Sequence, residues 1–456
     1  MSTEAPVTKK RARPSASEPP QRAGIWPPPE GTWIALAGLL PIFVAHYLYA
    51  ALYSETAFTL IMAEALVLAA LLLRSSLRSD LGRMRGLMLP AVFFAMVISV
   101  GLLQLTPWAP GGPHPVWGYV GRGPGSTSID RSSTVVELIK LMGLACIFLV
   151  GGITGASDTR ARAAIHVTLG LGLVLALWAF FGSVTGTIYS TGGRRLEAHF
   201  LNPNTAGTFM ACMLVLSTAL LLRQFRTARP ADRIVAVAPV AAVGLTFAVC
   251  LLMTASRGAV AALVVALAVF VGLQLFSAKL KLSRAVLIGL ASVVVGGFAI
   301  YVAGDLVIER FMSTDRDAVV RTAIWSEHWQ AFLASPLLGY GVGSTETVNK
   351  TLISATNYST LQNIKAILNV YLQWLEQAGL VGAIAMFACV GTVVLTTIVG
   401  SIRRTRMTLL LFGLVSVDLV FLVHGATDFA LDAYSMAAMW SYLLGLQLAL
   451  SQGSTK

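Results

Sequence analysis

Arginine side chains in short polar patterns are the residues of this chain best suited to chemistry. The patterns are Arg194-Arg195-Leu-Glu197-Ala-His199-Phe-Leu-Asn202-Pro203-Asn204, Thr254-Ala-Ser256-Arg257-Gly258, and Arg321 four residues before Trp325. A guanidinium group stays protonated at any relevant pH, and its planar fork binds phosphate oxygens bidentately. We therefore expect Arg257, Arg321 and Arg195, in that order of preference, to stabilise phosphate charge, while Arg194 is hard to separate from Arg195.

Two glycine-containing segments add candidates for substrate binding. Trp325 is followed by the break Ser335-Pro336-Leu-Leu-Gly339-Tyr-Gly341-Val-Gly343, and Leu368-Asn369-x-Tyr371 opens an apolar stretch. The candidates are Trp325, Gly341, Gly343, Asn369 and Tyr371. Backbone N–H groups of the glycine segment could hold phosphate, although a simple turn explains the glycines equally well.

Structural roles compete with functional ones at several of these positions. Arginines near a membrane surface often bind lipid headgroups or snorkel to the interface. Asn202 and Asn204 precede an apolar stretch, where asparagine is a common helix cap. His424 and Asp428 lie four residues apart, which suits a buried structural pair as well as a functional one.

The composition excludes a soluble enzyme. Of 456 residues, 12% are charged and 56% are hydrophobic, with a mean hydropathy of +0.75, whereas soluble domains carry about 25% charged residues. The net charge of +12 comes mostly from cations in short gaps between apolar runs, so we expect membrane lipid and not nucleic acid as a partner. The four cysteines are not spaced like metal ligands, so they predict no metal site. They are Cys146, Cys212, Cys250 and Cys389.

Twelve apolar stretches predict an all-α, polytopic integral membrane protein. They cover residues 33–53, 56–73, 87–105, 134–153, 163–183, 203–222, 234–253, 258–276, 285–303, 369–399, 407–424 and 432–450. If the N-terminal tail is cytoplasmic, 22 of the 33 Lys and Arg fall on the cytoplasmic side, which places both termini inside. The tenth stretch fits either a tilted helix or a short interfacial helix leading into a span.

The spans divide the chain into five parts. Residues 1–30 form a disordered basic cytoplasmic tail, 31–303 hold spans one to nine, 304–368 form a large periplasmic loop, 369–450 hold spans ten to twelve, and 451–456 are the cytoplasmic C-terminus. In the large loop the pattern from Arg316 to Leu333 predicts an amphipathic helix near the outer surface, followed by a turn. One topology thus brings all the patterns above to the same side.

In the order, spacing and sidedness of these patterns, the chain resembles the O-antigen ligase and O-antigen polymerase superfamily of bacterial membrane glycosyltransferases. The resemblance runs from the loop before the fourth span to His424-x-x-x-Asp428-Phe429. It implies a glycan on undecaprenyl diphosphate as donor, an acceptor glycan, and metal-independent inverting transfer at the periplasmic face. It also implies a multi-pass protein of the bacterial inner membrane, with a chain-length regulator and a flippase as possible protein partners.

A polymerase of repeat units for O-antigen, capsule or exopolysaccharide is the leading hypothesis for function. A ligase that transfers the glycan to lipid A core or protein is the alternative with the same type of activity. The alternatives of another functional class are a transporter or flippase, and an inactive family member. No carboxylate cluster in an outer loop is suited to Mg²⁺, and we expect no metal or other cofactor. Arg257, Arg321 and Arg195 would then stabilise the departing diphosphate.

One position departs from the ligase branch of the family. There the fourth pattern normally begins with a histidine, and here that position is Leu368, which cannot transfer a proton. Possible general bases are His199, His328, Glu327 and Glu376. We expect His199 to be catalytic with the arginines, and His328 to lie on the surface of the interfacial helix.

Overall fold

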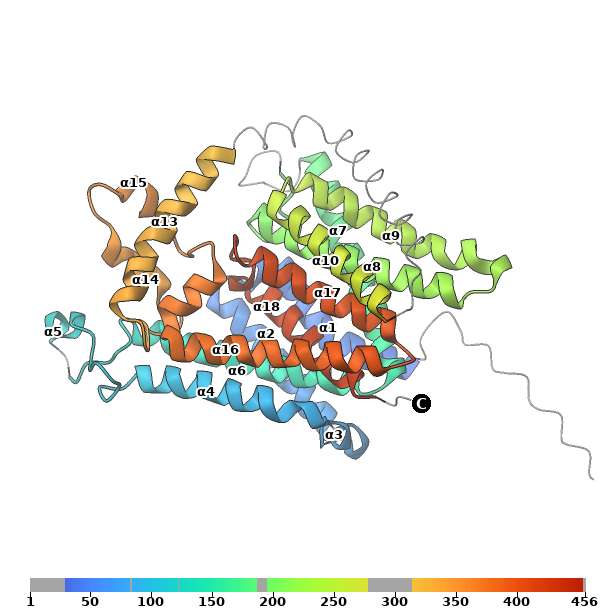
Figure 1. The fold of residues 1–456 in the computed structure, drawn as a ribbon, viewed down its shortest axis with the longest axis horizontal. Coiled ribbons are helices and arrows are strands. Elements are labelled where there is room, and N and C mark those ends of the chain that lie inside the picture. The colour runs from blue at the N-terminus through green and yellow to red at the C-terminus, as the bar shows by residue number, and fades with distance from the viewer. Residues whose placement is uncertain (1–28, 83, 122, 187–194, 278–313, 454–456) are drawn as a thin grey trace, which may run out of the picture.

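The computed structural model describes residues 29–82, 84–121, 123–186, 195–277 and 314–453, and all regular elements in these ranges are helices (Figure 1). The helices of the first half are α1 (Pro29–Tyr47), α2 (Ser54–Leu72), α3 (Ser75–Gly82), α4 (Met88–Gln104), α5 (Val116–Val120), α6 (Arg131–Gly155), α7 (Asp158–Thr185), α8 (Pro203–Thr227), α9 (Arg233–Met253) and α10 (Arg257–Phe276). Those of the second half are α13 (Thr314–Ala334), α14 (Thr345–Leu352), α15 (Tyr358–Leu361), α16 (Val370–Arg403), α17 (Thr408–His424) and α18 (Tyr434–Ser451).

A helix occupies each predicted span except 285–303, which lies outside the described residues together with most of the N-terminal tail. Eight helices of the described part are long and apolar enough to cross a membrane, and two shorter apolar helices cover residues 31–47 and 408–424. The chain is therefore an all-α integral membrane protein. The count of twelve spans and the periplasmic placement of the large loop stay predictions.

The two ends of the helix bundle hold different parts of the chain (Figure 1). The helices α5, α13, α14 and α15 gather at one end, which we call the loop end, while α3 and the C-terminus lie toward the other. At that other end, Arg160 pairs with Asp80 at 2.5 Å and Arg404 pairs with Asp158 at 2.8 Å. The predicted alternation of loops thus brings these basic segments together, away from α13.

The centre of the bundle is formed by α8, α17 and α18, which are buried along most of their length. Small residues allow close packing there. A Cβ on Gly151 or Gly155 of α6 would collide with backbone atoms of Tyr442 or Leu446 in α18, and a Cβ on Gly445 of α18 would collide with Phe148 of α6. Close backbone contact of this kind is a usual source of stability between helices in a membrane.

Helix α16 is broken at Gly379, where φ is 61° and ψ is −172°. The segment after α13 fills the break. The N–H groups of Tyr340 and Gly341 donate to the carbonyls of Glu376 and Gln377 at 3.0 and 2.9 Å, and the N–H of Leu380 donates to Pro336 at 2.8 Å. Backbone groups that the break would leave unpaired are therefore satisfied. The tenth predicted span is a short helical segment followed by a longer one, the second of the two arrangements expected.

The helix predicted from Arg316 to Leu333 is present as α13, and the turn expected after it is present as residues 335–344, while the interfacial placement of the helix stays a prediction. The first predicted span is shorter than expected because α1 ends at Tyr47. Tyr49, Ala50 and Ala51 all have φ near +55°, a conformation that no helix of L-residues continues.

Candidate functional site

Arg195 connects the segment before α8 with the junction of α9 and α10. Its Nε donates to the carbonyl of Thr254 at 2.8 Å, and its Nη2 donates to Asn204 Oδ1 at 3.0 Å and to the carbonyl of Ala255 at 3.5 Å. Carbonyls at a helix C-terminus lack partners within the helix, so a cation there is stabilising. Arg195 is half-buried and holds the α9–α10 junction in place.

Arg257 is the first residue of α10 and follows Ser256, whose Oγ accepts a hydrogen bond from the N–H of Ala259 at 3.4 Å. Ala255 before them has φ of +47°, so the chain turns sharply between α9 and α10. The Ser256-Arg257-Gly258 pattern thus contains a helix cap, a half-buried cation and a glycine. It is the junction that Arg195 braces from the side.

Gly258 lies directly against His424 at the end of α17. A Cβ on Gly258 would be 2.6 Å from His424 Nε2 and 2.7 Å from Cδ2, so no larger residue fits. The Nδ1 of His424 is 2.6 Å from Thr208 Oγ1 of α8, and the ring is buried. His424 therefore joins α8, α10 and α17 one residue away from Arg257.

Asp428 lies four residues after His424, in the loop between α17 and α18, and is fully buried. Asn204 Nδ2 donates to its Oδ1 at 3.4 Å, while its Oδ2 has no hydrogen-bond partner in the described residues. Burial raises the pKa of Asp428 to about 6, and the positive charge of Arg321 partly opposes that rise. Arg321 of α13 is therefore electrostatically coupled to Asp428.

These contacts bring four predicted elements to one place at the loop end. Arg195, Arg257 and Arg321 come from three separate segments of the chain, and the His424–Asp428 segment lies among them. We call these five residues the arginine cluster. Guanidinium groups arranged in this way can hold an anion such as a phosphate group, while the carboxylate of Asp428 offsets part of their charge.

Comparison with known proteins gives a family match for part of the chain. Residues 241–387 match the protein-family model described as O-antigen ligase. This match supports the resemblance to the O-antigen ligase and polymerase superfamily over the matched region. No curated protein matches the chain. The matched family indicates a glycosyltransferase type of enzyme and implies a lipid-linked glycan as substrate.

The region matched to the O-antigen ligase family contains Arg257, Arg321, the glycine segment and the start of α16, whereas Arg195, His424 and Asp428 lie outside it. The structure joins these two groups through hydrogen bonds and packing. The arginine cluster therefore combines family residues with residues that flank the family region. Arg194 lies outside the described residues.

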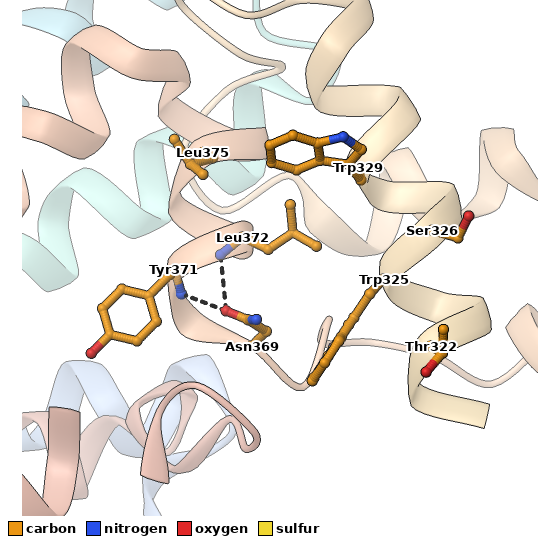
Figure 2. Close-up of a pocket in the computed structure, with 8 residues that line it drawn as sticks. All are labelled: Thr322, Trp325, Ser326, Trp329, Asn369, Tyr371, Leu372 and Leu375. Atoms are coloured by element: carbon orange, nitrogen blue, oxygen red, sulfur yellow. Dashed lines mark hydrogen bonds between the residues drawn. The ribbon is translucent and has the colours of Figure 1, made fainter. Parts of the chain in front are cut away.

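Trp325, Asn369 and Tyr371 all line an open hollow between α13 and α16 (Figure 2). Asn369 caps α16, because its Oδ1 accepts from the N–H groups of Tyr371 and Leu372 at 3.0 and 3.1 Å. The hydroxyl of Tyr371 donates to the carbonyl of Leu422 at 2.6 Å, and its ring points away from the two indole rings of the hollow. Tyr371 thus links α16 to α17.

Gly341 and Gly343 have structural partners. Both have positive φ, of 112° and 80°. A Cβ on Gly341 would lie 2.7 Å from Ser128 Cβ and 2.8 Å from Thr134 Oγ1, and one on Gly343 would lie 2.8 Å from the carbonyl oxygen of Ser133. Since the N–H of Gly341 is also used in the α16 break, the segment has the properties of the packed turn that the sequence allowed.

His199 lies in an aromatic cluster apart from these hydrogen bonds. Its ring stacks on Tyr47 and Tyr49 at centroid distances of 5.2 and 5.4 Å, and the ring of Trp178 meets it edge-on at 4.1 Å. Burial lowers its pKa, and its Nδ1 has no hydrogen-bond partner in the described part of the chain. The structure does not connect His199 with Arg257 or Arg321 through any of these contacts.

The expectation that His328 lies on the surface of α13 is wrong. His328 is fully buried and pairs through Nδ1 with Glu376 Oε2 of α16, which is also fully buried. Its Nε2 is 3.3 Å from Asn349 Oδ1, and Asn349 Nδ2 donates to the carbonyls of Leu361 and Ile364 at 2.8 and 3.1 Å. His328 and Glu376 therefore fasten α13 and α14 to α16.

Leu368, at the position where the ligase branch has histidine, adopts a left-handed conformation with φ of 59° immediately before the cap of α16. Its side chain packs against a small apolar core formed by Ile324, Leu361, Ile367 and Leu372. The position therefore contributes to packing between α13 and α16.

Sequence reasoning missed several polar residues that organise the site. Thr208 holds His424, and Gln104 of α4 donates to the carbonyl of Gln377 at 2.8 Å and accepts from the N–H of Val342 at 3.1 Å. The available signal was a polar side chain inside or at the end of an apolar run. It indicates a buried partner without identifying that partner.

Proposed function

We propose that this protein polymerises oligosaccharide repeat units carried on undecaprenyl diphosphate, at the periplasmic face of the bacterial inner membrane. The observation that carries the proposal is the arginine cluster. Arg195 and Asp428 both contact Asn204, Gly258 beside Arg257 packs against His424, and Arg321 interacts electrostatically with Asp428. In this proposal the cluster faces the periplasm, and both termini are cytoplasmic. The leading product is O-antigen, capsule or exopolysaccharide.

The reaction is an inverting glycosyl transfer. A hydroxyl of the acceptor glycan attacks the anomeric carbon of the donor, the bond from that carbon to the diphosphate oxygen breaks, and its electron pair stays on the diphosphate. The charge that grows on the diphosphate is stabilised by Arg257 and Arg321, whose forks bind phosphate oxygens in a region of low dielectric constant. In the proposal the arginines supply the positive charge that stabilises the leaving diphosphate.

In the proposal, Arg195 is a positioning residue for the junction between α9 and α10. Its Nε and Nη2 already donate to Thr254, Ala255 and Asn204, so it orients the junction that begins with Arg257. A shift of this junction by 1 Å would misalign a phosphate-binding group and reduce the rate. The roles proposed for Arg194 as a substrate-binding residue and for His199 as a base rest on the sequence patterns.

Asp428 is the stronger candidate for the general base. Its Oδ2 has no hydrogen-bond partner in the described residues, and a pKa of about 6 leaves most of the carboxylates ionised at neutral pH. Since Asp428 is fully buried, the acceptor must displace a neighbouring group to reach it. The 3.4 Å hydrogen bond from Asn204 is long enough to be given up in that step.

The ligase function is the second candidate, because both activities occur in the family. Leucine at position 368 counts against it, since the histidine expected there in ligases is absent. The two functions differ in their products. A polymerase lengthens the chain on the lipid carrier, whereas a ligase moves a finished chain to lipid A core or protein.

Polysaccharide profiling in a deletion strain tests the proposal. The strain is complemented with wild type, Arg257→Ala, Arg321→Ala, or Lys350→Ala as the control, and each protein is checked for membrane expression. Lys350 is a cation of the same end, but it is 65% exposed and paired with Glu346 at 2.9 Å. We expect single repeat units on the carrier in the arginine variants and long chains with Lys350→Ala.

Other outcomes would contradict the proposal. Accumulation of full-length polymer on the carrier in the deletion strain would identify a ligase. Normal polymer in both arginine variants would show that the arginine cluster is not the reaction site. A chain-length regulator and a flippase, both of which we propose as partners, are tested by co-purification from the same strains.

A further inference from the structure

The open hollow between α13 and α16 has two indole rings as its most prominent feature (Figure 2). Its volume is about 440 Å³, and the side chains that matter for its chemistry are Trp325, Trp329, Ser326, Asn369, Leu372 and Leu375. Both indoles extend from α13 toward the first segment of α16. Among the described residues no Lys or Arg lines the hollow, so the chemistry of these lining residues does not favour a phosphate group.

The indole rings are held in place before any ligand binds. Trp325 Nε1 donates to the carbonyl of Ile367 at 3.0 Å, which fixes the orientation of that ring. Trp329 packs at a tilt against Phe332 with ring centroids 5.1 Å apart, yet remains 45% exposed. A ring that is fixed and exposed offers a binding surface at low entropic cost.

The hollow adjoins the arginine cluster. Arg321 is the residue directly before Thr322, which lines the hollow. On the other wall, Asn369 precedes Val370, whose N–H donates to the carbonyl of Gly425 at 2.8 Å, next to His424. A ligand bound at the arginine cluster can therefore extend into the hollow without crossing the bundle.

The composition of α13 favours a water-soluble ligand over a lipid chain. Although α13 has 21 residues, it is not among the helices apolar enough to cross a membrane, and it carries Asp315, Asp317 and Arg321. The wall from α16 belongs to the short segment before the break at Gly379. A ligand here would lie at the loop end, against a helix that is too polar to cross a membrane.

We propose that this hollow is the subsite for the acceptor glycan, with Trp329 and Trp325 stacked against the apolar C–H faces of one or two pyranose rings. The proposal rests on the proposed glycosyl transfer and extends it by assigning the acceptor to α13 and α16. Ser326 and Asn369 provide polar groups at the edge of the same surface. Indoles give contact area while hydroxyl and amide groups set orientation, which is the usual division in small-ligand sites.

Binding of free oligosaccharide to the purified full-length protein tests this subsite without requiring turnover. The probe is the repeat-unit oligosaccharide released by mild acid from the lipid carrier of the host strain, and its binding is followed by saturation-transfer NMR. Trp329→Ala should weaken binding about tenfold, a loss in the range of a single aromatic contact. Trp33→Ala is the matched control, since Trp33 is 71% exposed but lies in the first turns of α1, away from the hollow.

A second variant guards against an effect on folding. Trp325→Phe keeps an aromatic ring but removes the hydrogen bond to Ile367 and part of the ring surface, so it should weaken binding by a smaller factor than Trp329→Ala. Unchanged oligosaccharide binding in Trp329→Ala, or no binding to wild type at millimolar probe, would overturn the subsite. If Trp329→Ala lost binding of the carrier-linked donor but still bound the free oligosaccharide, the hollow would be assigned to the polyprenyl chain instead.

The same measurement separates this inference from the proposed function. Arg321→Ala should leave oligosaccharide binding unchanged, because its side chain does not line the hollow. If oligosaccharide binds through Trp329 but the arginine variants polymerise normally, the subsite stands and the proposed reaction site is wrong. If the arginine variants are inactive but Trp329→Ala binds the oligosaccharide normally, the proposed reaction site stands and the subsite is wrong.

Discussion

Replacing Gly258 by alanine should slow the enzyme without unfolding it. The added Cβ would lie 2.6 Å from His424 Nε2 and 2.7 Å from Cδ2, well inside van der Waals contact. Either the imidazole moves and loses its 2.6 Å contact with Thr208, or α10 shifts together with Arg257. Overpacking of this kind costs about 1–3 kcal/mol. If that strain falls on the transition state, the rate drops about 5- to 150-fold.

Gly272 of the same helix provides the matched control for Gly258. A Cβ there would meet nothing within 4 Å, so Gly272→Ala should be active and at least as stable as wild type. The assay is polymer formation from carrier-linked repeat units by purified protein, with thermal unfolding measured in parallel. Wild-type rates for Gly258→Ala would refute the claim that His424 and the start of α10 form one packed site. Equal losses for both glycine variants would refute it as well.

Three further predictions concern titration and stability. Because burial raises the pKa of Asp428 to about 6, the rate of polymerisation should fall about tenfold for each pH unit below 6. The free energy of unfolding should decrease as pH rises from about 4 to 6, since the native carboxyl binds its proton more tightly than the unfolded one. Asp428→Asn should abolish the fall in rate at acid pH, and a variant that still shows this fall would exclude Asp428 as the base. His328→Leu should destabilise the protein by about 3–5 kcal/mol by leaving Glu376 buried without its partner. The double variant with Glu376→Leu should be less destabilised than either single variant, and additive losses in thermal unfolding would argue against the pair. Gly341→Ala should lower the free energy of unfolding by about 1–3 kcal/mol, because φ is 112° and the added Cβ would collide with Ser128 and Thr134. Gly118→Ala, with open space around the added Cβ, should leave the stability unchanged. Equal melting temperatures for these two variants would contradict the packed turn.

Much of the fold could be predicted from apolar run length alone. Each predicted span within the described residues coincides with a helix, because about 20 apolar residues have no other stable arrangement in lipid. The break at Gly379 could not be located in this way. Glycine is common inside membrane helices, and here the break depends on backbone partners at Pro336 and Tyr340, which lie some 40 residues earlier.

The arginines of the site were predictable because charge at a span junction is costly and therefore informative. Arg257 stands out for this reason, whereas Arg321 stands out by its place in the large loop four residues before Trp325, and Arg195 by its place in the pattern that leads into α8. The side chains that pair with each other across the fold were less predictable. The pairing of His328 with Glu376 joins residues 48 positions apart, and the helical pattern alone does not show that His328 faces α16.

Polymerisation by purified protein with Arg321→Lys and Arg321→Ala tests the central claim most directly. Carrier-linked repeat units are the only substrate, and the products are the lengthened glycan and free undecaprenyl diphosphate. Loss of a transition-state donor costs about 10²–10³ in rate, so Arg321→Ala should fall by that factor, and Arg321→Lys should recover only part of it, since lysine keeps the charge but loses the planar fork. Wild-type release of undecaprenyl diphosphate by Arg321→Ala would contradict the account.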